Sequence, residues 1–271
     1  AVNDLRSRGL VYTIPNGMAK TILETERQSD INDATMSMDG LAESKADRPK
    51  YDLSGLPLPI IHKDFSFSAR QVMTSRNGGS PLDTTMAELS ARKVAEYAEK
   101  LVLGKQTDYT YGGGTIQGYT TLTGRMTKDL TAPTASGWTP ATLVNEILEM
   151  RAQAVAQYHY GPYMLYTAPS WDIYLDDDYS SAKGDNTLRE RIQKIQGLLD
   201  VQTADYLEDY EVLLVQFTTD VVRMVVGMDI TTVQWESHGG MQLNFKVMCI
   251  LVPQMRLDIN SKGGIVHGEA A

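Results

Sequence analysis

The longest regular pattern of apolar and polar positions in the chain runs from Met241 to Ile259. Every odd position in it is apolar or Pro, whereas most even positions outside the middle are polar. This alternation predicts a β-strand. The run is far longer than a usual strand, which has about five or six residues. Because Pro253 has no N–H to donate, we expect two successive segments. The first is covered on both faces up to Leu251, and the second is half-exposed from Gln254 to Ile259.

A shorter alternation from Ile61 to Ala69 predicts a second strand, with Phe65 and Phe67 on its apolar side. Lys63 is the one departure from that side. We interpret this strand as one arm of a long hairpin. Further strands are expected at 163–168, 212–217, 221–226 and 231–235.

Two long helices are predicted by apolar positions spaced three and four residues apart. The first begins at Ser80-Pro81, with Ser as N-cap and Pro in the first turn, and ends at Gly104. The second begins at Thr139-Pro140 by the same logic and ends before Gly161-Pro162. Short helices are expected after Pro169 and after Thr187, which has the spacing of a capping box with Glu190.

Residues 1–57 contain few regular patterns. Asp, Asn, Ser, Gly and Pro recur in them, which is typical of a loop or arm, and residues 1–40 show no convincing apolar stripe. The Gly-rich segment 111–118 is not followed by Gly-Lys-Ser/Thr, so we interpret it as a flexible turn and not as a phosphate loop.

Residue types that are typical of catalytic or metal sites are scattered. No spacing places two histidines on one helical face, so each is expected to be isolated. The histidines are His62, His159, His238 and His267. The acidic run 176–178 lacks the alternating ligands of an EF-hand and is interpreted as a solvated patch. We therefore expect no enzyme, no cofactor and no metal site.

Composition narrows the class further. The chain has 271 residues and a formal net charge of −9, which disfavours a protein that reads nucleic acid through clustered Lys and Arg. No run of about 18 apolar residues is present, and no basic region precedes an apolar one at the N-terminus, so neither a membrane segment nor a secretory signal is expected. The single Cys249 lies on the apolar side of the long strand and predicts a buried thiol in a protein that folds in a reducing place.

Several local phrases occur in the order found in one group of shell proteins. Ala91-Arg-Lys-Val-Ala-Glu-Tyr-Ala-Glu in the first long helix is similar to the amphipathic "AARK" helix of that group, and Gly114-Thr-Ile-Gln-Gly118 to its "GIEG" phrase. Segments 188–195, 204–207, 211–215, 221–230 and 244–247 resemble its C-terminal half. The chain thus resembles tailed-bacteriophage major capsid proteins of the HK97-like fold, and their relatives the encapsulins, or linocin-like proteins.

The resemblance implies an α+β protein with the HK97-like major capsid protein fold. Its expected parts are an N-terminal arm (1–50), an extended hairpin loop (51–80), a peripheral domain with a long spine helix (81–137), an axial domain (138–240) and a peripheral-domain strand with the C-terminus (241–271). It also implies self-assembly into pentamers and hexamers of an icosahedral shell, with a loop that lies over the adjacent subunit.

Two sets of contact residues follow from the resemblance. Contacts between subunits are expected at Lys63, Phe65, Phe67 and Arg70. A loop near the symmetry axis is expected to line a pore with Asp176, Asp177, Asp178, Lys183 and Asp185.

We interpret the chain as a phage major capsid protein in the virion, assembled in the cytoplasm of the host bacterium around double-stranded DNA that it does not read. Its expected partners are itself and the portal, scaffolding and decoration proteins. An encapsulin shell that holds a cargo enzyme stays open, although the missing apolar stripe in residues 1–40 disfavours it. Weaker alternatives are an α+β enzyme that uses the acidic run with His159 or His238, and an adaptor or tail component.

Overall fold

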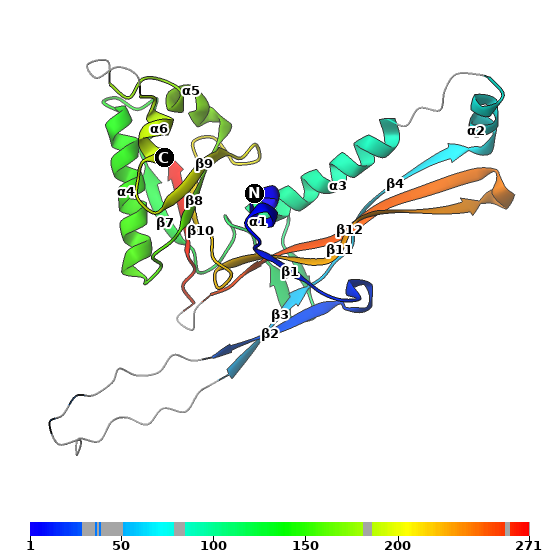
Figure 1. The fold of residues 1–271 in the computed structure, drawn as a ribbon, viewed down its shortest axis with the longest axis horizontal. Coiled ribbons are helices and arrows are strands. Elements are labelled where there is room, and N and C mark those ends of the chain that lie inside the picture. Colours follow the sequence, from blue (N-terminus) through cyan, green and yellow to red (C-terminus); the bar gives the residue numbers. More distant parts are fainter. Residues whose placement is uncertain are drawn as a thin grey trace.

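Two separate β-sheets dominate the computed structural model, which describes residues 1–28, 36, 38, 51–78, 85–180, 186–257 and 261–270. We call the four-stranded sheet, in the order β1-β11-β12-β4, the peripheral sheet. The five-stranded sheet, in the order β7-β13-β10-β8-β9, is the axial sheet. Figure 1 shows the axial sheet with its helices on the left and the elongated peripheral sheet on the right. Helices and strands are thus combined as the sequence predicts for an α+β fold.

The peripheral sheet is long and carries one long helix. Its strands are β1 (Val11–Thr13), β4 (Ile61–Ser68), β11 (Val222–Ser237) and β12 (Gln242–Met255). The predicted spine helix is α3 (Thr85–Leu103), and it contacts β4 and β12. It ends as predicted at Gly104, whose φ of +84° favours glycine. The predicted N-cap Ser80-Pro81 lies outside the described residues.

Strand β12 confirms the long strand, but as one continuous element. It runs through Pro253, which pairs with Met224 of β11. The pairing between β4 and β12 ends at Cys249, so β4 does not reach Pro253. On the β4 side of β12, position 253 therefore has no partner that needs a backbone N–H. The half-exposed second segment is confirmed only in part: Gln254 is buried and the strand ends at Met255, whereas Arg256 is exposed and residues 258 and 259 lie outside the described residues. A hydrogen bond from a neighbouring arginine satisfies the Gln254 side chain and permits this burial.

Strand β4 confirms the predicted strand at 61–69, but not its predicted partner. It pairs antiparallel with β12 and is no arm of a hairpin. The ring of Phe65 stacks on that of Phe245, with ring centroids 5.0 Å apart. The apolar alternation therefore reflects packing inside the peripheral sheet, because a period of two does not specify which strand is the neighbour. The extended hairpin that the structure describes comes earlier, as β2 (Ile22–Gln28) with β3 (Tyr51–Pro57).

The axial sheet is covered by short and long helices. Its strands are β7 (Met126–Leu130), β8 (Tyr163–Thr167), β9 (Leu198–Thr203), β10 (Val212–Gln216) and β13 (Ile265–Ala270). Helix α4 (Pro140–Ala156) begins after Thr139 as predicted and packs against β7 and β13. Helix α6 (Leu188–Gln193) confirms one half of the predicted capping box, since Thr187 Oγ1 accepts a hydrogen bond from Glu190 N at 3.3 Å. The remaining helices are α2 (Ala69–Arg76), η2 (Pro169–Trp171), α5 (Asp172–Leu175) and η3 (His238–Gly240).

The N-terminal residues are more regular than their sequence suggests. A short helix, α1 (Val2–Ser7), buries Leu5, and β1 pairs in parallel with β11. Turn η1 (Gly17–Ala19) lies so close to β11 that a Cβ at Gly17 would be 2.2 Å from the Gly227 carbonyl oxygen. The register of β11 against β12 shifts beside Gly227, yet β11 joins the strands predicted at 221–226 and 231–235 into one. Such tertiary contacts leave no periodic signal in the sequence.

The Gly-rich segment forms a small hairpin and no phosphate loop. Strands β5 (Tyr109–Tyr111) and β6 (Gly114–Ile116) are joined by Gly112 and Gly113, which both have positive φ, as the predicted turn requires. The hairpin packs on β3, where a Cβ at Gly114 would be 2.0 Å from the Gly55 carbonyl oxygen. It therefore supports the base of the β2–β3 hairpin.

The chain passes repeatedly between the two sheets. Strand β11 follows β10 out of the axial sheet, β12 returns beside β11, and β13 joins the axial sheet again. The predicted division at 240/241 therefore falls inside the β11–β12 hairpin, and residues 241–271 contribute to both sheets. Sequence order alone does not reveal these crossovers. In the described part of the chain, no helix is long and apolar enough to cross a membrane.

Candidate functional site

The residues predicted to contact other subunits differ in their exposure, and their contact with a neighbour stays a prediction. Lys63 and Arg70 are exposed and Phe67 is half-buried, but Phe65 is only 9% exposed. Phe65 and Phe67 also pack edge to face, with ring centroids 5.8 Å apart. Phe65 is therefore held inside its own subunit by the aromatic cluster, and only the exposed residues of the set can reach a neighbour.

A groove of about 470 Å³ lies between α3 and the start of β4. Its apolar lining includes Ile61, Val94, Leu101 and Ile116. Lys63, Lys93 and Lys100 also line it, so the groove combines apolar and basic groups. Its one carboxylate, Glu96, accepts hydrogen bonds from Arg92 at 2.7 Å and Lys93 at 2.6 Å, and these bonds lower its pKa. The groove is therefore suited to a segment that is apolar and acidic.

The β2–β3 hairpin has this composition in its described residues. Glu24, Glu26 and Asp52 are exposed, and the apolar Leu53 is 58% exposed. The two strands pair with each other over seven residues each and with no further strand in the described ranges. A two-stranded ribbon is marginally stable in water by itself. The β5–β6 hairpin packs on β3 within the subunit, and the exposed Glu24, Glu26 and Leu53 are placed to contact a further surface.

The outer edge of β11 is also open. Strand β1 pairs only with Met224–Val226, and residues 229–236 are exposed along the remaining edge. Among the described residues, β12 is their only strand partner. Ile230, Val233 and Trp235 make this edge rich in β-forming side chains. An unprotected edge of this kind is a template for pairing with another chain.

The predicted pore loop is described only in part. Asp176, Asp177 and Asp178 are exposed at the end of α5, whereas Lys183 and Asp185 lie outside the described residues. Arg189 on α6 holds this end by donating to Asp176 at 3.0 Å and to Asp172 at 2.9 Å. The acidic run is thus anchored to the axial body, and its position at a pore stays a prediction.

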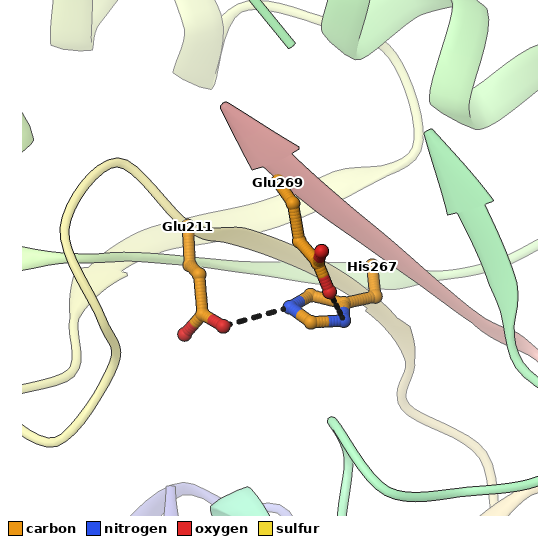
Figure 2. Close-up of side chains that lie close together, drawn as sticks. All are labelled: Glu211, His267 and Glu269. Atoms are coloured by element: carbon orange, nitrogen blue, oxygen red, sulfur yellow. Dashed lines mark hydrogen bonds and ion pairs between the residues drawn. The ribbon is translucent and has the colours of Figure 1, made fainter. Parts of the chain in front are cut away.

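A group of ionisable side chains, of which Glu211 and His267 are buried and Glu269 is exposed, lies beside the axial sheet (Figure 2). His267 on β13 has Glu211 Oε1 3.2 Å from Nε2 and Glu269 Oε1 3.1 Å from Nδ1. Lys105 follows the spine helix in the chain, and its Nζ is 2.8 Å from the same oxygen of Glu211. The prediction that every histidine is isolated is therefore wrong for His267. Glu211 is 56 positions away, so no local spacing could reveal this contact, whereas Glu269 lies two positions along the same strand.

Electrostatics keeps Glu211 ionised in this cluster. Burial alone would raise the pKa of Glu211, but hydrogen bonds from His267, Lys105 and the backbone N–H of Glu208 outweigh it and lower the pKa to about 2. Each oxygen of the carboxylate therefore has a donor, as a buried charge requires.

The geometry favours an ion-pair network over a metal centre. Ligand-type atoms of Glu211, His267 and Glu269 lie within 4.8 Å of one another. The imidazole stands between the two carboxylates, with one at each ring nitrogen, so the three groups do not face a common point (Figure 2). Lys105 also supplies a positive charge where a cation would have to bind Glu211.

Cys249 is buried as predicted. Burial raises the pKa of its thiol to about 11, so the reactive thiolate is a minor species at neutral pH.

Comparison with known proteins agrees with this architecture. A model described as a family of unknown function, DUF6260, matches residues 13–268. The type 1 encapsulin shell protein EncA of Myxococcus xanthus (strain DK1622) is 30% identical over 115 residues, which cover 41% of this chain and 36% of that protein. The chain therefore matches little more than a third of the length of this curated relative.

Solved capsids match over almost the whole chain. The capsid of Myoviridae phage XM1 superimposes with a TM-score of 0.70 at 12% identity, covering 98% of this chain and 91% of that one. The capsid of a native GTA particle gives 0.68 at 13% identity, covering 98% and 90%. A virus-like particle from Pyrococcus furiosus gives 0.63 at 16% identity, covering 96% and 89%. These likenesses confirm the predicted HK97-like capsid fold.

Proposed function

We propose that this chain, which belongs to the DUF6260 family, is the repeating subunit of a closed icosahedral shell. The observation that carries the proposal is the match to capsid proteins over 98% of the chain with a TM-score of 0.70. Surfaces that stay incomplete in one subunit support it independently. They are the β2–β3 hairpin, the groove beside α3 and the open edge of β11.

Charge and shape favour contact between the hairpin of one copy and the groove of the next. The hairpin presents Glu24, Glu26 and Leu53, whereas the groove offers an apolar floor with Lys63 and Lys100. Packing of the exposed leucine against this floor would remove apolar surface from water, which is favourable by about 25 cal/mol per Å². In this proposal Lys63 contacts a neighbouring subunit, as expected from the resemblance. It does so through its charge, whereas Phe65 and Phe67 take no part in the contact.

Charge reversal tests this contact. The single variants Glu26→Lys and Lys63→Glu should assemble poorly, because each places like charges together. The double variant should recover assembly, since it restores opposite charges with their positions exchanged. Light scattering of the folded proteins measures this. If both single variants assemble as well as the wild type, the proposed contact between hairpin and groove is wrong.

The particle that we favour is the head of a tailed phage that encloses double-stranded DNA. Likeness to the phage XM1 capsid supports this assignment. The net charge of −9 fits a wall that encloses DNA without reading its sequence. Portal, scaffolding and decoration proteins would then be its partners.

An encapsulin compartment is the second candidate, and one observation favours it. The type 1 encapsulin shell protein EncA of Myxococcus xanthus is 30% identical over 115 residues. Electron microscopy with mass spectrometry of particles from the native host separates the two candidates. DNA and a portal protein at one vertex would support the phage head, whereas a single enriched enzyme inside would support the compartment.

A further inference from the structure

The end of the spine helix is fixed by its backbone before any side chain contributes. Lys105 N donates to Lys100 O at 2.9 Å, and Gly104 N donates to Leu101 O at 3.3 Å, which together form a Schellman motif. A Cβ at Gly104 would lie 2.8 Å from Thr120 Oγ1, so the glycine is also required by space. Lys105 therefore leaves α3 in one defined direction.

In this direction the Lys105 side chain reaches the axial body, by which we mean the axial sheet with its helices and connecting segments. Its Nζ is 2.8 Å from Glu211 Oε1 and 3.1 Å from Glu208 Oε1. Earlier in the helix, Lys100 Nζ lies 4.8 Å from the centroid of the Tyr206 ring. All three partners belong to the segment that connects β9 with β10. Two cations thus link the spine helix of the peripheral sheet to one segment of the axial sheet.

The contact continues into the axial sheet as a buried chain of ionisable side chains. The side chains of Lys105 and Glu211 are 17% and 7% exposed, and that of His267 is 3% exposed. Glu211 Oε2 accepts a hydrogen bond from Glu208 N at 2.7 Å, while Oε1 faces both Lys105 and His267. A rotation between the bodies would leave this carboxylate buried with too few donors, at a cost that an apolar contact would not impose.

We propose that the Lys105–Glu211–His267 chain is a joint that fixes the angle between the peripheral and axial sheets, and thereby the curvature of the shell. The shell is the function proposed above, and the joint is a property of the single subunit. A buried ion pair adds little net stability compared with an apolar pair of similar size. Here it favours one arrangement, because Glu211 loses a donor when Lys105 moves away. Apolar side chains could shift against one another without losing a specific contact. The Glu211 carboxylate keeps all its hydrogen-bond donors in one arrangement only.

The test removes the charges while it keeps the volume. The double variant Lys105→Met/Glu211→Gln should fold, because no unpaired buried charge remains. Small-angle X-ray scattering of dissociated subunits should show a larger and more variable radius of gyration than in the wild type. Particles of the variant should show a wider distribution of diameters in electron micrographs. The control Lys128→Met removes the 2.7 Å ion pair with Glu149, which lies within the axial body, and should leave both measurements unchanged.

The radius of gyration and the particle diameter show whether the Lys105–Glu211–His267 chain fixes the angle between the two sheets. A folded double variant with the wild-type radius of gyration and diameter would overturn the proposal. If the double variant fails to fold, Lys105→Arg keeps the charge but lengthens the link, and an unchanged radius of gyration would overturn the proposal equally. A wild-type chain that forms no particles would refute the shell, while the scattering measurement on subunits would still test the joint.

Discussion

Replacing Phe65 by Ala distinguishes a residue of the subunit core from a residue of the interface. Phe65 is 9% exposed, and its ring lies 5.0 Å from that of Phe245 and 5.8 Å from that of Phe67. Truncation of a buried phenylalanine costs about 3–5 kcal/mol, because apolar contacts are lost and a cavity remains. We expect the free energy of unfolding of the dissociated Phe65→Ala subunit to fall by about this amount. Urea denaturation followed by circular dichroism measures the change.

The comparison with Tyr97→Ala makes this prediction sharper. Tyr97 is 42% exposed and lines the groove, so its truncation should change subunit stability by less than about 1 kcal/mol and should weaken assembly instead. Stability of the Phe65→Ala subunit within about 1 kcal/mol of the wild type, together with loss of assembly, would refute our placement of Phe65 in the core.

Three further predictions follow from single sites. Gly17→Ala should lower the melting temperature of the subunit, since its Cβ would lie 2.2 Å from the Gly227 carbonyl oxygen, whereas Gly78→Ala, with no atom within 4 Å but a positive φ, should cost only backbone strain. Stability should fall as the pH is lowered from about 4.5 towards 2, because the folded pKa of Glu211 is about 2 and its ordinary value is 4.5; a carboxylate with a lowered folded pKa stabilises the fold above its unfolded pKa and loses this effect as the pH falls through the folded pKa. Denaturant titrations of the wild type and Glu211→Gln should converge over this range, and parallel curves would contradict the assignment. Cys249 should react with a thiol reagent only after unfolding, because it is buried and its pKa is raised to about 11.

The elements were predictable where local pattern determines structure. The alternation at 61–69 and 241–259 gave strands, and the caps at Thr139 and Gly104 marked helix ends, because side-chain period and capping are local properties. The partner of β4 was not predictable in this way. Its alternation fits a hairpin arm and a strand of a larger sheet equally well, and only the tertiary fold brings Phe65 onto Phe245.

The candidate surfaces depend on contacts that are distant in sequence. The buried cluster joins Lys105, Glu211 and His267 from three elements, and no spacing links them. Gly17 and Gly227 meet at a bulge for the same reason. Lys63 was identified by its place on an expected strand, and the structure adds its place in the groove. The acidic run 176–178 was visible in the sequence, whereas Arg189, which anchors Asp176, was not an expected partner.

Cryo-electron microscopy of the purified full-length chain tests the central claim most directly. We expect closed particles with icosahedral symmetry, in which the β2–β3 hairpin of one subunit lies in the groove beside α3 of the next. Monomers or small open oligomers as the only species, from a chain that is folded by circular dichroism, would contradict the claim that this protein builds a shell.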